Sequence, residues 1–134
     1  MSTREASCSC GQLRLVVEGE PVRISVCHCL ECQKRTGSAF GVQARYAREQ
    51  VQAIAGRSSS FERTGDSGST ARFHFCPDCG STVFWDLASL PAFIAIAVGN
   101  FADPAFPPPT YSVYEARRHG WVDVPDGPGV RHLE

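Results

Sequence analysis

The stretches Cys27-His28-Cys29-Leu30-Glu31-Cys32 and Cys76-Pro77-Asp78-Cys79-Gly80 decide the fold, together with Cys8-Ser9-Cys10-Gly11 near the start of the chain. They contain all 7 cysteines. Cysteines separated by one or two residues can bring two thiolates to one metal ion, each at about 2.3 Å. Pro77 presets φ and Gly80 accepts a positive φ, so the second stretch suits the tight turn of a metal knuckle. Because the cysteine count is odd, a fully paired disulfide scaffold is excluded for a single chain.

The number of ligands that a zinc site needs suggests how these cysteines divide. A closed structural site takes four ligands, and a catalytic site takes three protein ligands with one open position. The first and last stretches along the chain supply a set of four: Cys8, Cys10, Cys76 and Cys79. The middle stretch supplies a trio: Cys27, Cys29 and Cys32. The spacing leaves another division open, in which the trio joins the pair at Cys76 and Cys79 and the first two cysteines stay free.

Two other interpretations of the trio remain open. The chain could hold one zinc site and three ordinary thiols, since a free cysteine often behaves as a small buried hydrophobe. Three cysteines beside the polar His28 and Glu31 would, however, make a poor core segment. A redox pair at Cys29 and Cys32 has suitable spacing, but the sequence lacks the βαβ pattern that surrounds such pairs.

The chain of 134 residues is predicted to form one domain, residues 1–134, of mainly β structure with little helix. Its 43% hydrophobic and 20% charged residues are ordinary for a globular domain. Short alternating or apolar runs predict the strands: 13–18, 24–27, 72–75, 83–85, 92–98 and 111–113. Aromatic residues expected in the core are Phe40, Phe84, Trp85, Phe93 and Phe101. One short turn is expected around residues 38–40, a turn or strand at 48–53, and loops at 56–60, 65–69 and 107–109.

The charge and hydropathy patterns exclude several classes of protein. The formal net charge is −1, from 13 basic and 14 acidic residues, so no polybasic nucleic-acid surface is expected. No apolar run approaches the roughly 18 residues of a membrane-spanning helix. The first residues lack the charged-then-apolar pattern of a secretory signal. We therefore expect a cytoplasmic protein with no membrane partner, whose thiols stay reduced and available to a metal.

The cysteine stretches and their neighbours resemble the glutathione-dependent formaldehyde-activating enzymes, a family whose domain also occurs in centromere protein V. The second stretch continues as Gln33-Lys34-Arg35-Thr36-Gly37-Ser38-Ala39-Phe40, and the third is preceded by Arg72-Phe73-His74-Phe75. A weaker similarity runs through Val98-Gly99-Asn100-Phe101-Ala102-Asp103-Pro104 to Trp121. The likeness therefore covers nearly the whole chain. It departs from the family after the proline-rich stretch, where Tyr111 stands nearest a position that is commonly His.

The resemblance implies a fold, two metal sites and a reaction. The fold would be the mainly-β "β-tent" of several short antiparallel strands with zinc knuckles. The set of four cysteines would hold a structural zinc, and the trio would hold a second zinc with an open position. The activity would be that of a carbon–sulfur lyase, in which glutathione adds reversibly to formaldehyde to give S-hydroxymethylglutathione. The departure at Tyr111 bears on which thiol and aldehyde are used.

Two further residues are candidates for a catalytic part. His28 lies inside the trio and could move a proton near neutral pH, or it could be a solvent-facing knuckle residue. Arg35 could bind a substrate carboxylate in a bidentate pair, or it could be an ordinary surface arginine. Arg72 is a candidate donor to a thiolate, and His74 is expected to be structural. The competing interpretation is a zinc-stabilised binding module without catalysis, which would need only the set of four cysteines; a lyase for another thiol or aldehyde is a second competitor.

Overall fold

The computed structural model describes residues 2–65, 68–124 and 126–134, and the predicted loop at 65–69 falls partly outside them. Short strands dominate, as the sequence predicts. The elements in chain order are β1 (Thr3–Ser7), β2 (Arg14–Glu18), β3 (Arg23–Cys27), α1 (Leu30–Thr36), β4 (Gly41–Ala47), η1 (Arg48–Gln50), β5 (Val51–Ala55), β6 (Ser59–Thr64), β7 (Thr70–Phe75), β8 (Thr82–Leu87), β9 (Phe93–Ala97), η2 (Val98–Phe101), β10 (Tyr111–Val113), η3 (Glu115–Arg117) and β11 (Arg131–His132). None of the helices in the described part is long and apolar enough to cross a membrane.

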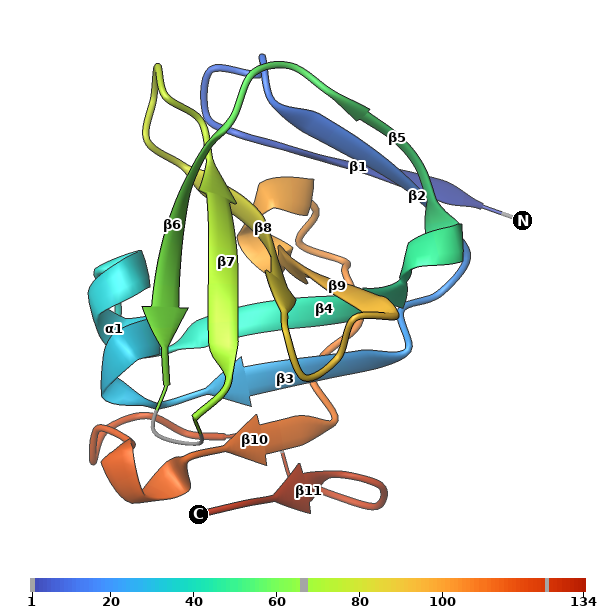
Figure 1. Cartoon of the computed structure of the whole chain (residues 1–134). Helices are drawn as coiled ribbons and strands as arrows, with labels where there is room; N and C mark the ends of the chain where they lie inside the picture. The colour runs from blue at the N-terminus through green and yellow to red at the C-terminus, as the bar shows by residue number, and fades with distance from the viewer. Residues whose placement is uncertain (1, 66–67, 125) are drawn as a thin grey trace.

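The strands form two sheets (Figure 1). The small sheet has the order β1-β2-β5, and the large sheet has the order β11-β10-β3-β4-β9-β8-β7-β6. In Figure 1 the strands β6 and β7 stand upright, whereas β3 and β4 run across the view, so the large sheet is strongly twisted. Most neighbours are antiparallel, but β10 runs parallel to both β3 and β11. The long connection through the prolines at 107–109 returns the chain to that edge in the direction of β3.

The main core lies between the two sheets. Alternation along β2 buries Leu15 and Val17, and Ile94 and Ile96 of β9 turn to the same core. Burying each such side chain stabilises the fold by about 1.5–3 kcal/mol. Of the aromatics expected in the core, three are buried and two are half-buried; the buried three are Phe84, Trp85 and Phe101. Sequence alternation therefore predicted the core well.

The opposite face of the large sheet carries a second, smaller apolar cluster. Phe73 and Trp85 are paired across β7 and β8, with ring centroids 5.4 Å apart. Ala95 and Ala97 of β9, which alternate with the core-facing isoleucines, pack against this cluster. Because alanine side chains are short, this face of the sheet leaves room above it.

The helix α1 begins inside the second cysteine stretch and not at the turn expected around residues 38–40. The Sγ of Cys29 caps the N-terminus by accepting from the Cys32 amide at 3.3 Å. Gly37 ends the helix in the left-handed region, with φ 68°, and its amide bonds to the Gln33 carbonyl. A thiolate can take the place of the usual Ser or Asp cap, a signal that the sequence interpretation missed. Further along, residues 48–53 form both expected structures, η1 followed by β5.

Candidate metal centres and the adjoining cavity

The set of four cysteines assembles where two turns meet. Cys8 and Cys10 lie in the turn between β1 and β2 of the small sheet, and Cys76 and Cys79 lie in the turn between β7 and β8 of the large sheet. All four Sγ atoms lie within 4.8 Å of one another. The Cys8–Cys10 and Cys10–Cys76 sulfur distances are 3.6 and 3.7 Å. Sulfurs about 2.3 Å from a tetrahedral metal would be about 3.8 Å apart, so these residues fit a four-thiolate metal site.

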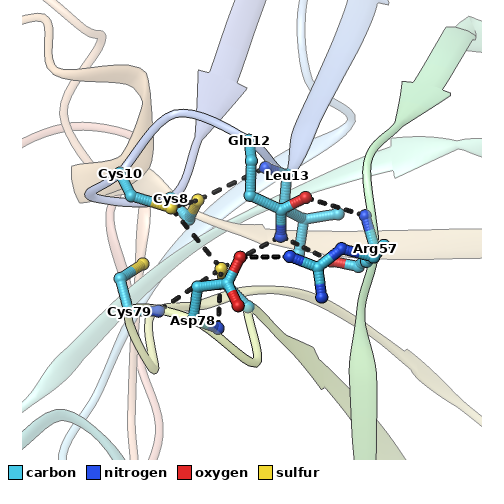
Figure 2. Close-up of polar contacts among 8 residues, drawn as sticks. Cys8, Cys10, Gln12, Leu13, Arg57, Asp78 and Cys79 are labelled. Atoms are coloured by element: carbon cyan, nitrogen blue, oxygen red, sulfur yellow. Dashed lines mark hydrogen bonds and ion pairs between the residues drawn. The ribbon is translucent and has the colours of Figure 1, made fainter.

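Fixed N–H donors point at the sulfurs of this set, as Figure 2 shows. The Leu13 amide donates to Cys8 Sγ at 3.3 Å, and Gln12 Nε2 donates to Cys76 Sγ at 3.0 Å. Burial by itself would raise the pKa of Cys76, but the hydrogen bond from Gln12 and the backbone amides that follow Cys76 lower it. A hydrogen bond with the Ser81 hydroxyl lowers the pKa of Cys79 to about 5. The surroundings of Cys76 and Cys79 therefore favour thiolates, the form that binds a metal, whereas at Cys10 the lowering by the Gln12 backbone amide is outweighed by hydrogen bonds to the neighbouring cysteines, which raise its pKa.

Gln12 is a supporting residue that the sequence interpretation missed. Its Nε2 also donates to the Arg57 carbonyl at 2.7 Å, and its Oε1 accepts from the Arg57 amide at 2.9 Å. Arg57 in turn forms an ion pair with Asp78 of the knuckle (Figure 2). Arg57 lies where the chain crosses from β5 in the small sheet to β6 in the large one. The side-chain amide of Gln12 thus links the metal knuckle to that crossing. Unlike the cysteines, Gln12 belongs to no recognisable motif, so no signal in the sequence marked it.

The trio forms a second candidate metal site at the junction of β3 and α1. The Sγ atoms of Cys27, Cys29 and Cys32 lie within 4.8 Å of one another. Hydrogen bonds from Cys27 and Cys32 lower the pKa of Cys29 to about 2, and the same contacts raise the pKa of Cys27. Three sulfurs that share protons so closely are a donor set that a thiophilic metal can take over, releasing the protons. The trio therefore fits a metal bound through three thiolates.

The trio opens into a cavity of about 540 Å³ on the face of the large sheet that carries Phe73 and Trp85. Such a volume lies within the range of about 300–1,000 Å³ that is typical of small-molecule sites. Side chains of α1, β4 and β6–β8 form its walls, and residues that follow β10 close one side. The described lining residues that matter below are Cys27, Cys29, Cys32, Arg35, Gln43, Arg63, Phe73 and Trp85. The set of four cysteines does not line this cavity.

The structure brings Arg35 to the cavity but not His28. The Arg35 guanidinium lies over the Trp85 ring, 4.2 Å from its centroid, and it forms no ion pair with a described residue. His28 is fully buried, its Nε2 lies 3.1 Å from the Ser112 Oγ, and it does not line the cavity. Burial lowers the pKa of His28, which favours the neutral ring. The alternatives of a solvent-facing knuckle residue for His28 and an ordinary surface arginine for Arg35 therefore do not describe where these side chains lie.

Two other expectations have clear outcomes. Arg72 pairs with Glu62, with 3.0 Å between its Nη2 and the carboxylate, so it does not donate to a thiolate and that expectation is wrong. His74 stacks on Phe84 with centroids 4.5 Å apart and lies 3.5 Å from Asp86, which fits a structural part.

Comparisons with known proteins agree with this geometry. Residues 3–117 match the family described as Glutathione-dependent formaldehyde-activating enzyme. The chain belongs to this family. A formaldehyde-activating family of this kind works with glutathione and formaldehyde as small-molecule partners, and two cysteine groups that can each hold a metal are compatible with that chemistry.

Two further comparisons concern single proteins. No curated protein matches the chain. A crystal structure of a Rhodobacter sphaeroides protein aligns with a TM-score of 0.56 at 20% identity, covering 72% of this chain and 85% of that one. At this level of identity, the likeness shows a shared fold and nothing finer.

Proposed function

We propose that this chain adds a glutathione-like thiol to formaldehyde or another small aldehyde and forms an S-hydroxymethyl adduct. In this reaction a carbon–sulfur bond forms, the carbonyl π bond breaks, and the thiol proton ends on the former carbonyl oxygen. Nothing is oxidised or reduced. The family match supports the substrates. The observation that carries the proposal is the opening of a three-sulfur group into a cavity of about 540 Å³, since a purely structural metal site needs no such space.

The second metal in this proposal is zinc, held by the trio. When bound there, zinc would supply an open fourth position at which an incoming thiol is kept as a thiolate. Hydrogen bonds from Cys27 and Cys32 lower the pKa of Cys29 and favour its thiolate, and all three cysteines would hold the zinc as thiolates. The Arg35 guanidinium attracts an anionic group of the substrate, and the rings of Phe73 and Trp85 exclude water from one wall.

The remaining site residues have supporting parts in this proposal. The set of four cysteines holds a structural zinc that fastens the small sheet to the large one. His28 holds the loop between Cys27 and Cys29, because its ring bonds to Ser112 and its amide donates to the Val113 carbonyl at 3.0 Å. A buried neutral ring turned away from the cavity fits this part better than proton transfer to the substrate.

The test is adduct formation from ¹³C-formaldehyde and glutathione, followed by NMR on protein with a measured zinc content. We expect faster approach to equilibrium than without protein, two zinc ions per chain, and loss of the acceleration in Cys29→Ser. The contrary result has three parts: one zinc per chain whose content glutathione does not change, a trio that is alkylated freely, and no acceleration of adduct formation. Together they would show a zinc-stabilised binding module instead. Acceleration that survives in Cys29→Ser would show that the trio is not the reacting site.

A further inference from the structure

The cavity holds an arginine, Arg35, that forms no ion pair with a carboxylate of the described residues. Of the three lining arginines, Arg63 lies 3.6 Å from the carboxylate of Glu31, which also pairs with Lys34. Arg35 makes no such pair, and its Nη2 is buried without a hydrogen-bond partner in the described structure. A partly buried guanidinium is costly to leave unmatched, because every lost hydrogen bond to water must be replaced. Arg35 favours the thiolate of Cys32, but its Nη2 still lacks an acceptor, which we expect a ligand to supply.

The backbone is shaped to hold this guanidinium. A Cβ on Gly41 would lie 2.8 Å from Arg35 Nη2 and 3.5 Å from Cys32 Cβ. The glycine at the start of β4 thus makes room for the guanidinium between the strand and the trio. The ring of Trp85 covers another side, with 4.2 Å between its centroid and the arginine Cζ. Fixed in this way, the charge stands beside the metal-binding sulfurs and within reach of a molecule bound there.

A second uncommitted group lies two residues along the same strand. Gln43 points to the same face of β4 as Gly41, because side chains two residues apart share a face. It lines the cavity, and its Oε1 is buried without a hydrogen-bond partner among the described residues. A buried amide oxygen that lacks a donor destabilises the free protein, which makes it a natural acceptor for an N–H of a ligand. The wall of one cavity therefore offers both a cation and an acceptor.

We propose that Arg35 and Gln43 form a subsite for a carboxylate that has an N–H on its α-carbon, with Gly41 as the residue that positions the guanidinium. The carboxylate pairs with Arg35, and the neighbouring N–H donates to Gln43 Oε1. This inference rests on the proposed function, because it assumes a thiol whose sulfur reaches the trio. Both ends of glutathione have this chemistry. The glycine end is joined to the sulfur through fewer bonds, and Arg35 lies beside Cys32, so the short reach favours that end.

The experiment measures binding of S-methylglutathione by calorimetry. This ligand has no free thiol, so it cannot form the adduct, and its binding can fail or succeed independently of the activity. We expect its glycine ethyl ester to bind about 10- to 100-fold more weakly than the free acid, since a charge-assisted bond is lost. In Arg35→Gln the two ligands should bind alike. Gly41→Ala, which keeps the arginine but displaces it, should reduce the same ratio severalfold.

Two further variants make the signature specific. Gln43→Met should weaken both ligands by about 2- to 10-fold and leave their ratio unchanged, since acid and ester both keep the N–H. Arg63→Gln is the matched control in the same cavity, because that arginine already has Glu31 as a partner. We expect the control to keep the wild-type ratio between acid and ester. Circular dichroism of each variant shows whether it is folded before its affinity is compared.

The outcomes separate the two ends of the ligand and the two proposals. S-methylcysteinylglycine lacks the γ-glutamyl residue. If its affinity does not depend on Arg35, and if the glycine ethyl ester of S-methylglutathione binds as tightly as the free acid but still depends on Arg35, the γ-glutamyl carboxylate is the one bound, and the subsite stands. If wild-type protein shows no binding, or if Arg35→Gln keeps the full ratio, the subsite is overturned even where adduct formation is intact. Normal binding without any catalysed adduct formation would leave the subsite standing and overturn the proposed function alone.

Discussion

The amide of Gln12 should contribute measurable stability to the zinc-loaded protein. In Gln12→Ala, a hydrogen bond of 3.0 Å to Cys76 Sγ and two bonds to the backbone of Arg57 are lost. A bond to a thiolate is worth about 1.5–3 kcal/mol, and the two bonds to the exposed Arg57 backbone are each worth less because water can replace them. We therefore expect a loss of about 2–3 kcal/mol. For a chain of this length, that corresponds to a fall in Tm of about 6–15 °C.

The assay is a thermal melt of the zinc-loaded protein followed by circular dichroism. A matched control is Gln52→Ala, whose Nε2 donates to the Glu49 and Gln50 carbonyls at 3.4 and 3.3 Å on the exposed surface. We expect the control to lower Tm by no more than about 2 °C, since exposed changes fall within about 0.5 kcal/mol. Gln12→Ala should also transfer zinc to a chromophoric chelator faster than wild type. A fall in Tm no larger than that of the control would refute the assignment of Gln12 as a support of the metal knuckle.

Four other substitutions have distinct expected outcomes. Cys76→Ser should unfold the zinc-loaded chain or prevent its accumulation, whereas Cys29→Ser should keep the fold and lose one zinc by elemental analysis; similar melting of the two would contradict the division of roles. Gly56→Ala should lower Tm strongly, because Gly56 has φ +99° and the added Cβ would lie 2.0 Å from the backbone oxygen of Gln12. Glu115→Gln should lower Tm more at pH 5.5 than at pH 8.5. The hydrogen bond to Glu115 raises the pKa of His132 in the folded protein, so the pair stabilises the fold fully below pH 6.5, and this stabilisation is lost as pH rises through the raised pKa. An equal loss of Tm at both pH values would remove His132 from that explanation.

The fold class and the grouping of the cysteines could be read from the sequence for local reasons. Alternation along β2 and β9 marks a buried face without any knowledge of the partner strand. The four-plus-three division follows from ligand count, and the Sγ atoms do cluster in those two groups. The parallel placement of β10 beside β3 was beyond such reasoning, because it depends on a long connection whose path no local pattern records.

The supporting residues of the sites were harder to predict than the ligands. Gln12, Gly41 and Gln43 have no distinctive spacing, and each acts through a neighbour that is distant in sequence. Gly41 could have been noted as a glycine in a strand, which often marks the close approach of another group. For His28, sequence position suggested a place in the reaction, but the residue follows the buried end of β3, and its ring is fully buried against Ser112. The direction of each side chain, which the sequence does not record, decides whether a residue such as Gln43 or His28 lines the cavity.

The hydrogen bonds at the sulfurs give a physical reason why the two groups of cysteines should behave differently. In the described structure, Cys76 Sγ accepts from the Gln12 amide and from the backbone amides of Asp78 and Cys79, at 3.0, 3.3 and 3.5 Å. The trio receives fewer: among the described residues, the Cys32 amide donates to Cys29 Sγ and the Cys29 amide to the Cys27 sulfur. N–H donors withdraw electron density from a thiolate and fix its position, which suits a closed site that only holds the fold together. Sulfurs with fewer such donors, at the wall of a cavity, stay available to exchange a proton, a metal or an incoming thiol.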